Sequence, residues 1–240
     1  MAIREVYYQE KEFPISYTIA NPQAKESILI LHGWGSNKEI MQQAFSKQFK
    51  RLKQIYIDMP GFGQSPNESV VLTTQDYANI TALFLEAIEQ KPKVIAGHSF
   101  GGKVATLLKP TMLVLLSSAG ILVPKPFKVR AKIALFKLLK PFGIAKFRKL
   151  FVADDAKQMN EAMYETFKNV VDENFSQEFA SFPNKALLFW GKEDTATPLW
   201  TGQKIHSLIK NSKLYPLNGD HYFFLHHSDF IAKTIESELE

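Results

Sequence analysis

The chain has 240 residues and a formal net charge of +5, with 45% hydrophobic and 22% charged residues. These values are typical of a single folded domain and exclude a disordered chain, and the absence of cysteine excludes disulfides, thiolate metal ligands and a cysteine nucleophile. No apolar stretch reaches the roughly 18 residues of a membrane-spanning helix, and the first residues lack the apolar core of a secretory signal, so we expect a cytoplasmic protein.

Eight short runs of apolar and β-branched residues predict strands. They span residues 5–8, 15–19, 27–31, 54–58, 93–96, 112–116, 186–190 and 213–217. A polar turn joins the first two runs, which is typical of a hairpin, whereas the later runs are almost wholly apolar, as in parallel strands covered on both faces. Helical spacing of apolar residues recurs over residues 74–90, after Ser99, over 199–209 and from 229 onward. This alternation predicts an α/β protein with an eight-stranded, mostly parallel sheet flanked by helices.

Residues 121–182 interrupt the alternation, because they contain no strand pattern and proline and glycine break their helical patterns. We therefore expect a core domain of residues 1–120 and 183–240 with a helical cap of residues 121–182. Four apolar residues of the cap follow helical spacing and are predicted to line the substrate pocket: Val129, Ile133, Phe136 and Leu139. Residues 121–152 include nine Lys or Arg and no Asp or Glu. Because the basic charge is confined to one segment, it does not predict a nucleic-acid-binding fold.

A nucleophilic serine is predicted at the turn after the strand at 93–96. Residues 97–101 read Gly-His-Ser-Phe-Gly, the G-x-S-x-G pattern of a sharp strand-to-helix turn that presents the serine side chain away from the backbone. The flanking glycines let neighbouring chain approach without a clash. Ser99 is therefore the predicted nucleophile.

The serine needs a histidine base, and in folds with this turn the chain order is serine, acid, histidine. His221 follows the last predicted strand and satisfies this order, so it is the predicted base. His32 lies too early in the chain, and the turn geometry is expected to direct His98 elsewhere. The remaining candidates are expected at the surface or at a helix start: His206, His226 and His227.

The orienting acid is expected after the penultimate strand. Asp194 holds that position, and Glu193 is the nearest alternative. Asp220 is a weaker candidate, because side chains adjacent in the chain rarely converge. Asp58 precedes Ser99 and is expected to stabilise the turn that follows it.

Two backbone N–H groups are predicted to bind the oxyanion of the reaction. Phe100 begins the helix after the nucleophile, and Trp34 lies in the HGWG loop after the third strand. His32 is expected to brace this loop. Metal-ligand spacings and phosphate-binding glycine loops do not occur in the sequence, so no metal or organic cofactor is expected.

These segments resemble the α/β-hydrolase superfamily, including its capped esterases and meta-cleavage-product hydrolases. The resemblance is carried by HGWG at 32–35, DMPGFGQS at 58–65, GHSFGG at 97–102, WGKEDTATP at 190–198 and GDHYFF at 219–224. It implies a Ser99–His221–Asp194 triad and a cap over the site. We expect a serine hydrolase that cleaves a carboxylic ester or thioester through an acyl-enzyme. Carbon–carbon bond hydrolysis, acyl transfer to another acceptor and a non-catalytic binding role are the alternatives.

The basic cap predicts three kinds of partner. In the first case, the basic residues only face solvent on the outer side of a lid over a small-molecule ester. In the other two cases, they bind an anionic partner. The HGWG loop and cap are similar to those of esterases that act on acyl carrier proteins, which implies an acidic carrier protein with a carrier-linked ester. An anionic lipid surface is the other candidate, because a basic amphipathic helix lies well at a membrane interface.

Overall fold

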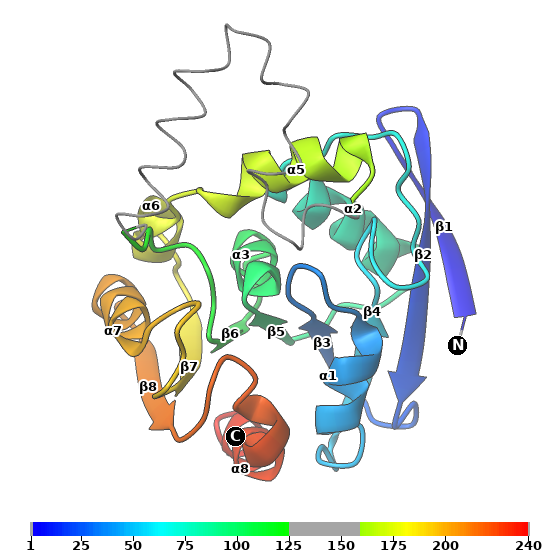
Figure 1. Ribbon diagram of the computed structural model, residues 1–240. Helices are drawn as coiled ribbons and strands as arrows, with labels where there is room; N and C mark the ends of the chain where they lie inside the picture. Colours follow the sequence, from blue (N-terminus) through cyan, green and yellow to red (C-terminus); the bar gives the residue numbers. More distant parts are fainter. Residues whose placement is uncertain (1, 125–158, 240) are drawn as a thin grey trace, which may run out of the picture.

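The structure is a computed structural model that describes residues 2–124 and 159–239 (Figure 1). Its sheet has eight strands in the order β1-β2-β4-β3-β5-β6-β7-β8. They are β1 (Ala2–Tyr8), β2 (Lys11–Ala20), β3 (Glu26–Leu31), β4 (Leu52–Ile57), β5 (Val94–His98), β6 (Met112–Leu116), β7 (Lys185–Gly191) and β8 (Ser212–Leu217). β2 pairs antiparallel with β1 and β4, and the other pairs are parallel. The predicted α/β class and mostly parallel sheet are confirmed.

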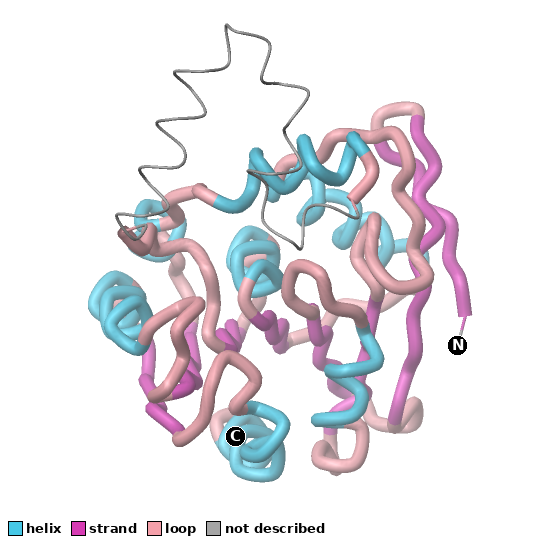
Figure 2. The backbone as a smooth tube through the Cα atoms, viewed as in Figure 1, coloured by secondary structure: helices cyan, strands magenta, loops and turns pink. Residues whose placement is uncertain are grey.

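Helices cover both faces of the sheet (Figure 2). They are α1 (Lys38–Phe45), α2 (Thr74–Ala87), α3 (Phe100–Leu107), α5 (Glu161–Val171), α6 (Ser176–Ala180), α7 (Leu199–Leu208) and α8 (Phe224–Ser237). In Figure 1, α2 and α3 lie above the sheet and α1 and α8 below it. Successive residues of a strand face opposite sides, so Leu29 packs in the cluster of α2 and α3, and Ile28 packs with α1 and α8. The central strands are therefore apolar throughout.

Two helices differ from the predicted elements. α1 was not among them, because it has only eight residues; Asn37 caps it by accepting a hydrogen bond from the Glu39 N–H at 3.2 Å. α8 begins at Phe224, earlier than expected, because the Phe224 ring is buried against Phe45 of α1. Among the helices of the described ranges, none is both long and apolar enough to cross a membrane.

Residues 121–124 and 159–182 are the described parts of the predicted cap, and the second part contains α5 and α6 and packs on the core. The Leu72 N–H donates to Thr166 Oγ1 at 2.9 Å. Lys103 of α3 is 2% exposed and donates hydrogen bonds to the Val170 carbonyl and, at 2.8 Å, to Glu173. The boundaries of the cap stay a prediction. The predicted pocket residues lie outside the described residues: Val129, Ile133, Phe136 and Leu139.

Candidate active site

Ser99 lies on the sharp turn between β5 and α3. Its φ of 50° is a conformation that costs a residue with a side chain about 1–3 kcal/mol. The Ser99 N–H donates to the Leu116 carbonyl at 3.1 Å, and the Ala119 N–H donates to the Ser99 carbonyl at 3.0 Å. A Cβ on Gly97 would overlap the backbone of Gly101, so the turn requires glycine there. The predicted nucleophile is thus half-buried at the carboxyl end of the parallel strands, where open sheets place their sites.

Asp194 lies in the loop after β7 and is buried. Its Oδ1 accepts hydrogen bonds from the backbone N–H groups of Ala196 at 2.8 Å and Thr197 at 2.9 Å. Burial alone raises the pKa of Asp194, but the hydrogen bond and charge of His221 and the Thr197 N–H outweigh burial and lower this pKa to about 2. Asp194 is therefore a carboxylate at neutral pH.

His221 lies in the loop between β8 and α8 and contacts Asp194. Its Nδ1 is 2.7 Å from Asp194 Oδ2. Because a carboxylate only accepts hydrogen bonds, Nδ1 carries the proton, and Nε2 of the neutral ring is left as an acceptor. The structure thus brings the predicted base and the predicted acid together in the tautomer that a general base needs.

His98, the residue before Ser99, lies against His221. The two ring centres are 4.5 Å apart, and His98 Nε2 is 3.0 Å from the His221 carbonyl oxygen, to which it donates. Burial, and then the neighbouring His221, lower the pKa of His98 to about 3, so its ring is neutral at physiological pH. His98 therefore connects the nucleophile turn to the base loop. The expectation that the turn directs His98 elsewhere is thus corrected, because the His98 ring packs against the base loop.

The HGWG loop lies beside the nucleophile turn. His32 is fully buried and braces the loop, because its Nε2 accepts from the Met59 N–H at 3.0 Å and its Nδ1 lies 2.7 Å from the Gly33 carbonyl. A Cβ on Gly33 would lie 3.2 Å from the Ser99 Cβ. The next residue, Trp34, thus stands at the edge of the site.

The two predicted oxyanion donors are neighbours in the structure. The Trp34 ring packs on the Phe100 ring, with centres 5.5 Å apart, and on the ring of Phe167 in α5 at 5.4 Å. Phe100 is the first residue of α3, and the N–H groups in the first turn of a helix have no acceptor within the helix. The HGWG loop and the start of α3 therefore meet next to Ser99.

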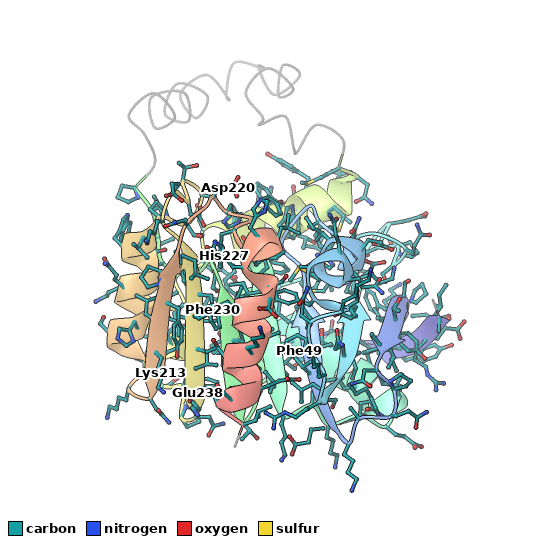
Figure 3. The ribbon with its side chains drawn as sticks, turned by 90° about the horizontal axis from the view of Figure 1, so that it is seen from below. Phe49, Lys213, Asp220, His227, Phe230 and Glu238 are labelled. Carbon is teal, nitrogen blue, oxygen red and sulfur yellow. The ribbon has the colours of Figure 1, made fainter. Side chains whose placement is uncertain are left out.

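The alternative acids have other contacts. Glu193 is exposed and accepts a hydrogen bond from the Gly219 N–H, and Asp220 is exposed and accepts from the Tyr222 N–H at 2.8 Å. In Figure 3, Lys213 marks one end of β8, and Asp220 lies beyond the other end of this strand. Asp58 is fully buried, pairs with Lys38 Nζ at 2.6 Å and accepts from the Gln64 N–H at 2.9 Å, which agrees with the expected role in its turn.

The remaining histidines have contacts other than with the Asp194–His221 pair. His206 on α7 is exposed and its Nδ1 is 2.8 Å from Ser212 Oγ. His226 on α8 is exposed, and His227, labelled in Figure 3, lies 2.8 Å from the Asn218 carbonyl. In residues 2–124 and 159–239, no group of three or more His, Asp or Glu side chains is arranged to hold a metal ion.

The fold and this arrangement agree with a comparison against protein families. The model of the alpha/beta hydrolase family matches residues 28–234, so the chain belongs to this family and is an enzyme of the hydrolase class.

Individual relatives cover different shares of the chain. The uncharacterized hydrolase YugF of Bacillus subtilis is 28% identical over 88% of this chain and 85% of its own length. The pimeloyl-[acyl-carrier protein] methyl ester esterase of Pseudoalteromonas atlantica is 32% identical over 35% of this chain and 33% of its own. The solved structure of the esterase EaEST from Exiguobacterium antarcticum has a TM-score of 0.74 at 18% identity and covers 98% of both chains, which shows a shared fold.

Proposed function

We propose that the protein is a serine hydrolase that cleaves a carboxylic ester or thioester through a triad of Ser99, His221 and Asp194. The observation that carries the proposal is the 2.7 Å hydrogen bond between His221 Nδ1 and the buried Asp194 carboxylate. The contact of His98 with the His221 carbonyl supports it, because it connects this pair to the turn that bears Ser99.

In the proposed reaction, Ser99 Oγ attacks the substrate carbonyl while His221 Nε2 accepts its proton. The same imidazolium then protonates the leaving alcohol or thiol, and an acyl group remains on Ser99. Water, deprotonated by His221, releases the acid and restores the serine. Asp194 holds the ring in its tautomer and stabilises the imidazolium. These steps use no metal or organic cofactor.

The oxyanion of each tetrahedral intermediate needs hydrogen-bond donors that are already in place. The backbone N–H groups of Trp34 and Phe100 are the proposed donors. Their support is the position of the HGWG loop against the Ser99 turn and the place of Phe100 at the start of α3. The positive end of the α3 dipole adds to the stabilisation of the negative oxygen.

The proposed substrate has an apolar acyl part. The rings of Trp34, Phe62, Phe100 and Phe167 pack together beside the Ser99 turn, and we propose that they provide an apolar, aromatic wall for this part. Residues 121–182 are proposed to form the cap over this wall. A carrier-linked ester is the second form of the substrate, favoured by the basic residues of the cap and by the relative whose name states an acyl-carrier protein ester.

Labelling with a fluorescent fluorophosphonate tests the proposal. We expect the wild-type protein to be labelled on the peptide that contains Ser99, and Ser99→Ala to remain unlabelled. Ser118→Ala is the matched control, because Ser118 is buried nearby, and its hydroxyl donates to the Ala119 carbonyl at 2.8 Å and lies 3.5 Å from the Ser99 backbone carbonyl, away from the reacting Ser99 hydroxyl; it should label like the wild type. Labelling that survives in Ser99→Ala would refute the assignment of the nucleophile.

Hydrolysis of p-nitrophenyl esters with increasing acyl length then tests the reaction and measures the pocket. Activity on these esters supports ester cleavage. A labelled protein that hydrolyses none of them, but cleaves a carbon–carbon bond in a vinylogous diketone acid, would replace the proposed reaction with the alternative one.

A further inference from the structure

Thr197 has a fixed position beside Asp194 and His221. It is buried in the loop between β7 and α7, three residues after Asp194. Its N–H donates to Asp194 Oδ1 at 2.9 Å, and its carbonyl accepts from the indole N–H of the fully buried Trp190 at 2.7 Å. Because both backbone groups are engaged, the backbone that carries the hydroxyl is held in place.

The Thr197 hydroxyl has three polar neighbours. Its Oγ1 lies 2.9 Å from Asp194 Oδ2, 3.0 Å from the Ser117 carbonyl and 3.4 Å from His221 Nδ1. One hydroxyl proton serves one acceptor at a time, and a hydrogen bond to an ionised carboxylate is stronger than one to a neutral carbonyl. The proton therefore goes to Asp194 Oδ2, the same oxygen that accepts from His221.

Ser117 is a second residue that contacts this carboxylate. It follows β6 with a φ of 44°, a strained conformation for a serine, and it is fully buried. Its N–H donates to the Phe189 carbonyl at 2.9 Å, and its Oγ accepts from the Gly191 N–H at 3.3 Å. A hydrogen bond from the Ser117 hydroxyl also lowers the pKa of Asp194. Hydrogen bonds thus connect Ser117, at the end of β6, to β7 on the side of the acid loop.

We propose that Thr197 is a positioning residue for the base: its hydroxyl donates to Asp194 Oδ2 and fixes the carboxylate in the orientation that holds His221. This inference rests on the proposed function, since it assigns a role relative to the Asp194–His221 pair. It goes beyond that function because Thr197 belongs to none of the three triad positions.

Loss of this hydroxyl has a predictable sign. A carboxylate with one donor fewer keeps more of its negative charge and attracts the proton of the His221 imidazolium more strongly. In the described ranges, the titratable groups that face His221 are Asp194, His98 and Tyr222. His98 is neutral, because burial and then His221 lower its pKa to about 3, so Asp194 supplies the charge that His221 senses.

Four variants isolate the hydroxyl. Thr197→Val keeps the shape of the side chain and removes the hydroxyl, whereas Thr197→Ser keeps the hydroxyl. If the valine variant does not fold, Thr197→Ala replaces it in the comparison with Thr197→Ser. Thr201→Val is the matched control, because Thr201 is also a buried threonine, on α7, but its hydroxyl donates to the Pro198 carbonyl at 2.8 Å.

The experiment is an NMR titration of the His221 ring in protein labelled with ¹⁵N-histidine, with His221→Gln as the assignment control. We expect the midpoint to rise in Thr197→Val and to stay at the wild-type value in Thr197→Ser and Thr201→Val. For ester hydrolysis, kcat of Thr197→Val should fall about 10- to 100-fold, the effect of a hydrogen bond to a charged group, with KM unchanged.

An unchanged or lower midpoint in Thr197→Val, or an equal rise in Thr201→Val, would overturn the inference. If the valine variant does not fold, the serine and alanine variants give the same comparison, and equal midpoints in the two would overturn it. The titration does not depend on activity. A wild-type protein without fluorophosphonate labelling would refute the proposed function while the titration still decides the role of Thr197.

Discussion

Asp194→Asn keeps the shape of the acid side chain but removes the charged oxygen that orients His221. The backbone N–H groups of Ala196 and Thr197 both donate to Oδ1, so the carbonyl oxygen of an asparagine must occupy that position. Its NH₂ group then stands where Oδ2 was, 2.7 Å from His221 Nδ1. Because NH₂ is a donor, Nδ1 must become the acceptor and the proton moves to Nε2. The ring can then no longer accept the Ser99 proton.

The size of the effect follows from this forced change of tautomer. A serine hydrolase with asparagine in place of the acid loses about 10⁴-fold in kcat, which corresponds to about 5 kcal/mol of transition-state stabilisation. We expect a loss of this size in Asp194→Asn, with little change in KM. The fold should persist, because the two backbone hydrogen bonds to position 194 remain.

The assay is steady-state hydrolysis of a short p-nitrophenyl ester. Glu193→Gln and Asp220→Asn are the matched controls, because these acids contact the Gly219 and Tyr222 N–H groups instead of His221. Both controls should keep most of the activity. A larger loss in Glu193→Gln than in Asp194→Asn would refute the assignment of the acid.

Three further predictions address stability, the base loop and the cap. The pKa of Asp194 is lowered from 3.8 to about 2, so the charged acid adds about 2 kcal/mol to the unfolding free energy above pH 4. This contribution is lost as the pH falls toward 2. Urea denaturation at a series of pH values should show it in the wild type and not in Asp194→Asn. His98→Leu should lower kcat about tenfold, and His98→Gln, which keeps a donor for the His221 carbonyl, should lower it less; equal losses would contradict the positioning by His98. Replacement of Lys128, Arg130 and Lys132 by Glu should raise KM for a carrier-linked ester but not for a small ester, and the difference should shrink as salt is added. Equal kinetics on both esters would show that these cap charges only face solvent.

The architecture was predictable because the core strands carry a strong local signal. β5, β6 and β7 are apolar on both faces, and the G-x-S-x-G pattern lies where a strand meets a helix. α1 was not predictable in this way, because it is short and has the weaker signal of Asn37 as its cap. The start of α8 depends on burial of Phe224 beneath the sheet, which is a tertiary contact.

The candidate site was predictable as far as chain order determines it. Ser99, Asp194 and His221 each follow a strand, and parallel strands bring these positions to one edge. The contacts of His98 and Thr197 depend on side-chain directions in the folded loops. A spacing of three residues from Asp194 does not by itself distinguish a hydroxyl that faces the acid from one that faces solvent.

The proposed mechanism requires that Ser99 carries the acyl group during turnover. The most direct measurement is peptide mass spectrometry of protein mixed with p-nitrophenyl butyrate and quenched in acid within the first turnover. We expect a butyryl group on the peptide with Ser99 in the wild type and none there in Ser99→Ala. A butyryl group on another residue, or turnover in Ser99→Ala at the wild-type rate, would contradict it.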